Sequence, residues 1–260
     1  MPPLSRFILC LLLFISNTLH ASQYSVMTEE LAPLAFKNND KIEGLSVEIV
    51  TEILKILNIK TDILLLPWAR AYHEILTKPN QVLFSMSRNN ERENLFHWVG
   101  PIIEDKVYFY SPKNSTLNIT TIEEAKKAPE IIVSRGFPEH QFLQNNNFKN
   151  LSLIVSPNQG FKLIAANRSD LMPAGELTMI PSLKKLNIAP ELIKNTNVSL
   201  FSHYLYIAMS IDTDHAEVAR WQNALDKMKT DGTYDSILEK YLPGARNTPP
   251  HSQSTNHELR

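Results

Sequence analysis

Residues 44–87, GLSVEIVTEILKILNIKTDILLLPWARAYHEILTKPNQVLFSMS, decide the fold class. Apolar side chains recur at helical spacing from Leu45 and Ile49 onward, so we predict a helix here. The run KTDILLL predicts a buried strand that ends at Pro67, before a second helix, and VLFSMS predicts another strand. With a strand predicted over residues 24–28, the order is strand, helix, strand, helix, strand. This order is typical of a parallel sheet with crossover helices.

Polar side chains follow the ends of these predicted strands. In open α/β sheets, ligands bind beyond the carboxyl ends of the strands, which places Trp68 and the residues after VLFSMS at one edge. Ser85 and Ser87 end that strand, and Arg92 follows a short polar turn. A guanidinium binds two carboxylate oxygens at once, and hydroxyls complete the contacts, so this segment favours a carboxylate ligand. The alternatives are a surface salt bridge for Arg92, ordinary strand-end serines and a core position for Trp68.

A second α/β unit is predicted after KVYFYSP, residues 106–112. Its first strand leads into Gly136 and Phe137, with a proline next in the chain. Because proline suits the first turn of a helix, we expect a helix to begin here, with free N–H groups that form a site for an anion. Arg135, beside this turn, either contacts a ligand or is solvated. Further strands are predicted at 130–134, 151–155, 170–173 and 203–211, with helices at 158–167, 214–229 and 234–241.

The two ends of the chain are predicted to lie outside the folded domain. Arg6 precedes the short apolar run FILCLLLFIS, which is the layout of a secretory signal peptide, so we predict residues 1–21 as a signal peptide cleaved after Ala21. The exported protein is then periplasmic. Cys10, the only cysteine, lies in this run, so the mature chain is expected to have no disulfide. Residues 244–260 form a polar tail that is predicted to be disordered.

Composition and motifs argue against several functions. The 26 basic and 27 acidic residues give a net charge of −1, so a nucleic-acid partner is not expected. The histidines show no paired spacing of the kind that metal sites use, and neither a phosphate-binding loop nor a nucleophile motif is present. We therefore expect no metal, no cofactor and no catalytic residue, and the protein is not predicted to be an enzyme.

Three segments together resemble one protein family. The first is a proline-containing loop followed by EGLSVEIVTEILKILNI, the second is FSMSRNNERENLFHWVGPI, and the third is DGTYDSILEKYL near the end. In this order and behind a signal peptide, they are similar to the family 3 periplasmic solute-binding proteins, of the polar amino-acid ABC transporter type. LPWARAY also resembles a variant seen in many members. The similarity extends over residues 24–242.

The resemblance implies an α/β fold of the type II periplasmic binding protein kind. Each of its two lobes is a mostly parallel sheet flanked by helices, and two crossing strands join the lobes, which close on a ligand by a hinge. The first lobe is expected to comprise residues 22–109 and 203–243, and the second residues 110–202. The crossings are expected near residues 108–111 and 202–207.

The resemblance also implies roles for individual residues. Arg92 takes the place of the carboxylate-binding arginine, Trp68 that of a wall against the ligand, and the second lobe departs from the family at Gly175. Gly175 stands where amino-acid binders place an ammonium-binding aspartate, and a shift of one residue would let Glu176 take that role. The residues expected to bind ligand are Arg92, Ser87, Ser85, Trp68, Gly136, Phe137 and Glu176.

The implied function is that of a monomeric receptor. It captures a small polar solute that bears a carboxylate, an amino acid or a relative of one, and delivers it to the membrane permease of an ABC transporter. Two alternatives share the fold. One is a secreted enzyme similar to cyclohexadienyl dehydratase, which needs a general acid, and Glu176 is the carboxyl group expected to take that role. The other is a protein that presents its ligand to a membrane sensor.

Overall fold

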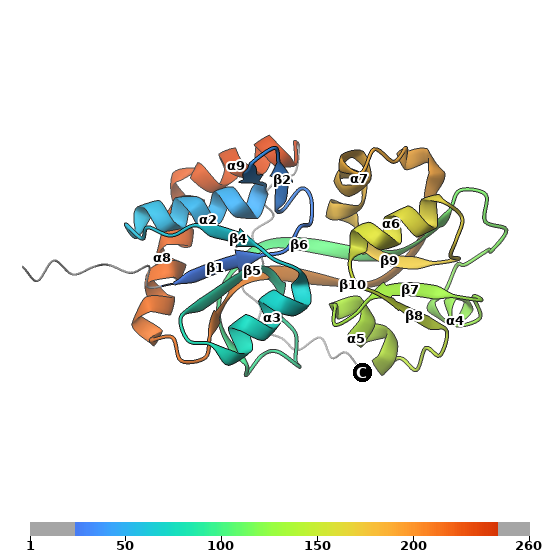
Figure 1. Ribbon diagram of the computed structural model, residues 1–260, viewed down its shortest axis with the longest axis horizontal. Helices are drawn as coiled ribbons and strands as arrows, with labels where there is room; N and C mark the ends of the chain where they lie inside the picture. The colour runs from blue at the N-terminus through green and yellow to red at the C-terminus, as the bar shows by residue number, and fades with distance from the viewer. Residues whose placement is uncertain (1–23, 244–260) are drawn as a thin grey trace, which may run out of the picture.

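The computed structural model describes residues 24–243, and both the predicted signal peptide and the predicted tail lie outside these described residues. The described chain forms two lobes side by side, joined by the long strands β6 and β10 (Figure 1). The predicted two-lobed α/β architecture is confirmed. Within residues 24–243, no helix has both the length and the apolar character needed to cross a membrane.

The first lobe follows the predicted alternation of strands and helices. Its elements are β1 (Ser25–Thr28), α2 (Leu45–Ile56), β4 (Ile63–Leu65), α3 (Trp68–Thr77) and β5 (Gln81–Ser87). Strand β1 pairs in parallel with both β4 and β5. A short hairpin of β2 (Phe36–Asn38) and β3 (Lys41–Glu43) precedes α2 and was not predicted.

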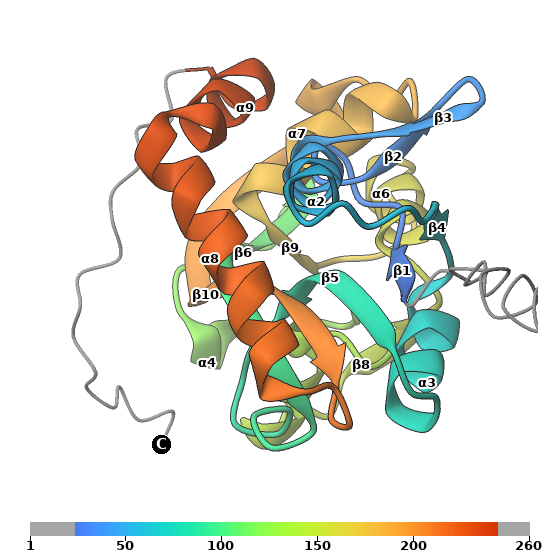
Figure 2. The ribbon, with the colours of Figure 1, turned by 90° about the vertical axis from the view of Figure 1, so that its left-hand side faces the viewer.

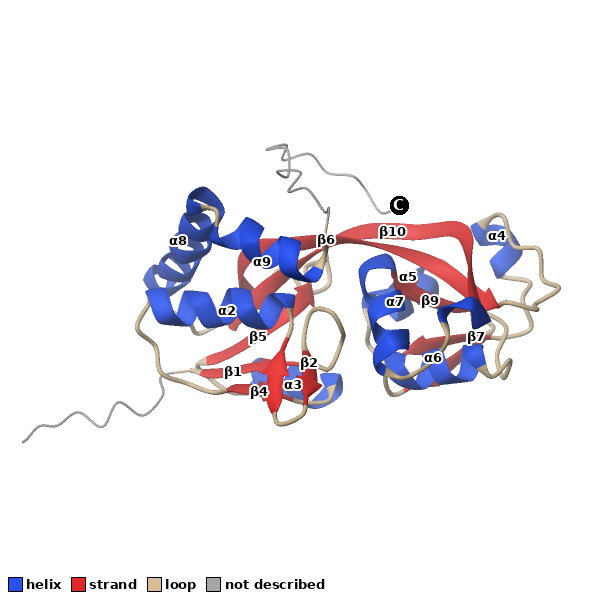
Figure 3. Cartoon of the chain, turned by 90° about the horizontal axis from the view of Figure 1, so that it is seen from above, coloured by secondary structure: helices blue, strands red, loops and turns tan. Residues whose placement is uncertain are grey.

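Two strands run through both lobes. They are β6 (Phe96–Pro112) and β10 (Ile193–Ser210), which pair with each other in antiparallel fashion along most of their length (Figure 3). Strand β10 also pairs with β5, and β6 pairs with β9 (Met172–Gly175). The resulting sheet has the order β4-β1-β5-β10-β6-β9, so it is parallel in the first lobe and antiparallel at the crossing strands.

The second lobe is built on a parallel pair of strands, β7 (Ile131–Ser134) and β8 (Leu151–Ile154). Local sequence explains where its helices begin: the side chains of Thr121 and Ser156 cap two of them, and prolines open the first turns of others. These helices are α4 (Ile122–Ala125), α5 (Pro138–Asn145), α6 (Pro157–Ala165), α7 (Glu176–Lys185) and the single turn η1 (Pro190–Leu192).

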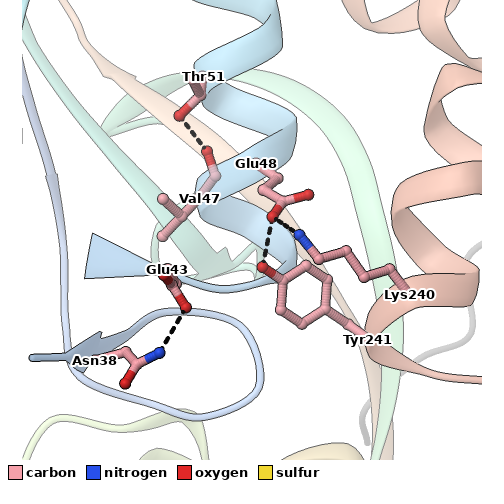
Figure 4. A network of polar contacts seen from close by, with 7 residues as sticks. All are labelled: Asn38, Glu43, Val47, Glu48, Thr51, Lys240 and Tyr241. Carbon is pink, nitrogen blue, oxygen red and sulfur yellow. Dashed lines mark hydrogen bonds and ion pairs between the residues drawn. The ribbon is translucent and has the colours of Figure 1, made fainter. Parts of the chain in front are cut away.

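The last two helices return to the first lobe. Figure 2 shows α8 (His215–Asp231) and α3 on opposite sides of β5, and Gly232, at a φ of 84°, turns the chain from α8 into α9 (Thr233–Tyr241). Glu48 of α2 accepts a 2.7 Å hydrogen bond from Tyr241 Oη and is also bonded to Lys240 (Figure 4). These contacts attach the end of the described chain to the first lobe.

Each lobe has its own hydrophobic core, and the cores locate the crossing. Ile102 and Leu205 pack in the core of the first lobe, whereas Val107, Phe109 and Leu200 pack in that of the second. Ile103 packs against the first core and Phe201 against the second, so strand β6 passes between the cores at residues 104–106 and strand β10 returns at residues 202–204. The lobe boundaries expected from the resemblance stay predictions.

Candidate functional site

A cavity of about 60 Å³ lies between the two lobes. The first lobe and the crossing strands contribute Glu29, Leu31, Leu34, Trp68, Ser85, Ser87, Arg92, Asp105 and Leu205 to its wall. The second lobe contributes Val133, Ser134, Phe137, Pro138, Glu139, Pro157, Phe161, Met172, Pro173, Ala174, Gly175 and Thr178.

Hydrogen bonds outside the cavity wall also join the two lobes. Asn89 Nδ2 donates to Gln141 Oε1 at 2.9 Å, and Ser182 Oγ donates to the carbonyl oxygen of Ala32 at 3.2 Å. The structure therefore shows the two lobes in direct contact.

Ser85 reaches the cavity because strand β5 is irregular at this residue. Phe84 pairs with Ile207 and Met86 pairs with Tyr206, so Ser85 has no opposite residue. Its φ of 62° is left-handed, as in a β-bulge, a feature that redirects side chains near functional sites. Its hydroxyl is buried and has no hydrogen-bond partner within the described chain.

Ser87 ends the same strand and contacts the returning strand β10. Its Oγ lies 2.6 Å from Nδ1 of His203. Burial, assisted by the nearby charge of Arg92, lowers the pKa of His203 to about 4, so this imidazole is neutral at pH 7. The hydroxyl of Ser87 is therefore held by a neutral ring.

Arg92 is almost completely buried, with 1% of its surface exposed. Nη1 donates to the carbonyl oxygen of Ser87 at 3.2 Å, and Nη2 donates to that of Gly136, in the other lobe, at 2.8 Å. Its Nε has no partner among the described residues. Burial lowers the pKa of this guanidinium, but arginine stays charged in proteins, so the cavity wall contains a cation with one unused donor.

Aromatic rings surround this guanidinium. The ring centroids of Trp68 and Tyr72 lie 5.1 and 5.4 Å from the Cζ of Arg92. Trp68 also lies 5.5 Å from the ring of Phe137, across the boundary between the lobes. Rings in this position hold the guanidinium by cation–π attraction and form an apolar wall for the cavity.

Three carboxyl groups in the cavity wall were not predicted as site residues. They are Glu29 after β1, Asp105 on the crossing strand β6 and Glu139 in the first turn of α5. Burial raises their pKa values, with repulsion between carboxylates adding to the effect, to about 8 for Glu29, about 6 for Asp105 and about 7 for Glu139. Oε2 of Glu139 is buried without a partner. The cavity is therefore richer in acidic groups than the sequence suggested.

The structure places most of the predicted site residues around this cavity. Arg92, Ser85, Ser87, Trp68 and Phe137 all line it.

Two predicted residues lie differently. Gly136 does not line the cavity but accepts the hydrogen bond from Arg92, and Glu176 is exposed at the start of α7, outside the cavity wall. The N–H groups expected to form an anion site are already used: that of Gly136 donates to His140 Nδ1 at 3.2 Å, and that of Phe137 donates to the carbonyl oxygen of Ser134 at 3.2 Å. Both acceptors lie within a few residues of the donors because the turn before α5 is tight, so these two N–H groups are not free.

The described residues contain no candidate metal site. Within residues 24–243, no group of three or more His, Cys, Asp or Glu side chains is arranged to hold a metal ion.

The fold and the cavity between its lobes define a two-lobed type II periplasmic binding protein. More specifically, the chain belongs to the bacterial extracellular solute-binding proteins, family 3, whose model matches residues 25–244. A curated relative is the probable amino-acid-binding protein YxeM of Bacillus subtilis strain 168, which is 23% identical over 232 residues, covering 87% of this chain and 84% of YxeM.

Solved structures agree on the fold. A histidine kinase sensor domain similar to periplasmic binding proteins superposes with a TM-score of 0.77 at 17% identity, covering 84% of this chain and 96% of that domain. The substrate-binding protein of an amino acid ABC transporter superposes with a TM-score of 0.73 at 16% identity, covering 84% of this chain and 99% of that protein. At such low identities, these matches establish the fold and leave the ligand to be argued from the cavity.

Proposed function

We propose that this protein captures a small solute bearing a carboxylate, an amino acid or a relative of one, between its lobes and delivers it to an ABC permease. The observation that carries the proposal is Arg92. Its guanidinium is 1% exposed, lines the cavity and keeps Nε without a partner. A buried donor left unpaired is costly, and a ligand carboxylate satisfies it.

The other groups around Arg92 fit the same ligand. The unpartnered hydroxyl of Ser85 is a second donor to the carboxylate, and Ser87 stands beside it at the end of the strand. Trp68 and Phe137 supply apolar surface from the two lobes for the rest of the solute. Gly136 contributes through its carbonyl oxygen, which orients the guanidinium in the closed protein.

Binding in this scheme is coupled to closure of the lobes. Between their cores, β6 and β10 cross as a two-stranded connection, and β10 is irregular here, since its pairing with β6 shifts between Ser199 and Phe201 and again between Leu205 and Ile207. Such irregular pairing gives the crossing a place to bend. A permease that recognises the closed form then receives only loaded protein.

A thermal-shift screen tests the binding step directly. The purified mature protein is heated with each of the twenty standard L-amino acids and with small carboxylates, and hits are measured by calorimetry. A ligand at about 100 times its Kd stabilises the protein by about 2.7 kcal/mol, a shift that is easily measured. If no amino acid or carboxylate raises the melting temperature, the proposal fails.

Transport is tested separately from binding. Deletion of the gene should abolish uptake of the radiolabelled ligand by whole cells, and plasmid-borne protein should restore it. Unchanged uptake, together with loss of a transcriptional response to the ligand, would show a sensory role in place of transport.

One observation favours an enzymatic alternative enough to test it. Oε2 of Glu139 is buried without a partner, and the pKa of this carboxyl is raised by burial to about 7, which suits a general acid. A dehydratase of this fold would act on prephenate or arogenate. Incubating the protein with each compound and following aromatic product by absorbance distinguishes the two functions, because a receptor leaves both compounds unchanged.

A further inference from the structure

The space beside Gly175 is filled by a carboxylate from another strand. A Cβ atom at position 175 would lie 2.0 Å from Oδ2 of Asp105 and 2.9 Å from its Cγ. The pairing of β6 with β9 explains this approach, since Gly175 lies opposite Val107 and Asp105 is two residues earlier on the same face. A side chain at position 175 and the carboxylate of Asp105 therefore exclude each other.

Asp105 is held in this position by backbone groups. It is 4% exposed, and its Oδ1 accepts hydrogen bonds from the N–H groups of Lys106 at 2.8 Å and Leu177 at 3.1 Å. Leu177 belongs to the first turn of α7, where a negative charge is favourable. The carboxylate is thus fixed at the wall of the cavity without a cationic partner, since within residues 24–243 no ion pair includes it.

Carboxyl groups outnumber basic groups in the wall of the cavity. Arg92 supplies one positive charge, whereas Glu29, Asp105 and Glu139 supply three carboxyl groups. Asp105 and Glu139 repel each other, and Oε2 of Glu139 has no partner. A positively charged group of the ligand, placed near Asp105, removes this repulsion and supplies the missing partner.

We propose that Asp105, which reaches the cavity from the crossing strand β6, binds the ammonium group of the ligand in place of a side chain at position 175. The inference rests on the proposed function and narrows it: the ligand carries an amine as well as a carboxylate, as an α-amino acid does. The carboxylate lies at Arg92, and the ammonium lies against Asp105, beside Glu139.

Asp105→Asn is the decisive variant. Asparagine keeps a side-chain oxygen for the N–H groups of Lys106 and Leu177, so the start of α7 is preserved while the charge is removed. The matched control is Glu176→Gln, which removes a charge from the exposed neighbour of Gly175. Each variant and the wild type are titrated by calorimetry with the L-amino acid that gives the largest thermal shift among the twenty standard ones.

We expect Asp105→Asn to weaken binding by about 30-fold or more, the usual loss when a buried charge pair loses one member. Glu176→Gln should bind within about threefold of the wild type. The melting temperature of ligand-free Asp105→Asn should not fall, which separates a binding role from a purely structural role at the start of α7. Affinity of Asp105→Asn within about threefold of the wild type, or an equal loss in Glu176→Gln, would overturn the inference.

An exchange of positions provides a second readout. Asp105→Gly removes the carboxylate, and adding Gly175→Asp to it restores a carboxylate to the same space. We expect the double variant to bind at least about tenfold more tightly than Asp105→Gly alone, by the charge-pair argument above. A double variant that melts like the wild type but binds no better than Asp105→Gly contradicts the inference. If the wild type itself binds no amino acid, the proposed function has failed, and this inference falls with it.

Discussion

Nη2 of Arg92 donates a 2.8 Å hydrogen bond to the carbonyl oxygen of Gly136, and this bond joins the first lobe to the second. The guanidinium therefore has two roles, one in the cavity and one in the contact between the lobes. It faces the cavity with its unpartnered Nε, and it holds the turn before α5 against the first lobe. A ligand carboxylate bound at this side chain is thus directly linked to the contact between lobes.

Replacing Arg92 should therefore reduce both affinity and closure. We expect Arg92→Ala to weaken ligand binding by about 2–5 kcal/mol, because the ligand carboxylate is left without its charged partner. Arg92→Lys keeps the charge but loses the planar fork, so it should fall between the alanine variant and the wild type. Calorimetry measures the affinities, and small-angle X-ray scattering with and without ligand measures closure.

Arg70→Ala is the control for this prediction. Arg70 is exposed on α3, close to Trp68 in sequence, and does not line the cavity. Its variant should bind like the wild type. If Arg92→Ala retains wild-type affinity, the proposed carboxylate site is wrong.

Ser85 should matter for binding more than for folding. Its hydroxyl has no partner within the described chain, so Ser85→Ala removes no internal hydrogen bond and should change the free energy of unfolding by less than about 1 kcal/mol. Ligand affinity should fall about 2–10-fold, the effect of one lost hydrogen bond. Urea unfolding without ligand and calorimetry with ligand measure the two effects. A variant that loses stability but keeps its affinity would assign Ser85 to the fold alone.

The parts of the fold that the sequence predicted well are those with strong local signals. The helix from Leu45 has regular apolar spacing, and the Pro138 turn is typical of a helix start. The strand before Pro67 was also predicted, but it lies at the edge of the sheet with Leu64 44% exposed, so the prediction that it is buried was wrong. Helix α7 was not predicted, because Pro181 stands within it and its apolar residues do not form a clear stripe. The β2–β3 hairpin is too short and polar for the alternation of residues to show.

The site was partly predictable for a different reason. Ser85 lies at the end of a predicted strand, and Trp68 and Arg92 follow the ends of predicted strands, where the edge of a sheet brings residues together. Asp105 lies in the middle of a strand that passes from one lobe to the other, and no local pattern indicates which face of that strand meets the cavity. The sequence gives only an indirect signal, which is that Gly175 stands where an aspartate was expected. In the structure, the carboxylate of Asp105 on β6 occupies the space that a side chain at position 175 would take.

The buried carboxyl groups predict a pH-dependent stability. Burial raises the pKa of Glu139 from 4.5 to about 7 in the folded protein. The folded state therefore holds this proton more tightly than the unfolded chain, and the associated stability is fully present below about pH 4.5 and is lost as the pH rises through 7. Urea unfolding of the ligand-free protein between pH 4.5 and 8 measures this trend.

The variant Glu139→Gln isolates the contribution of this group. At pH 8, the free energy of unfolding of Glu139→Gln should exceed that of the wild type. As the pH falls to 4.5, the stability of the wild type should rise steadily relative to that of the variant. Glu176→Gln, on the exposed side of the same lobe, serves as the control for loss of one surface charge. A difference between Glu139→Gln and the wild type that does not vary with pH would show that this carboxyl titrates normally.

The contact between α9 and α2 predicts a stability change that leaves binding intact. Tyr241 Oη donates a 2.7 Å hydrogen bond to Glu48, so Tyr241→Phe should cost about 1 kcal/mol, which lowers the melting temperature by about 2–4 °C in a protein of this size. Burial raises the pKa of Glu48, but hydrogen bonds from Lys240 and Tyr241 lower it further, so that it lies below 4.5 overall. The loss of stability in Tyr241→Phe should therefore diminish as the pH falls through that lowered pKa. Tyr204→Phe, at an exposed position, is the matched control. Because neither Tyr241 nor Tyr204 lines the cavity, both variants should bind ligand as the wild type does, and a loss of affinity in Tyr241→Phe would show that the docking of α9 influences the site.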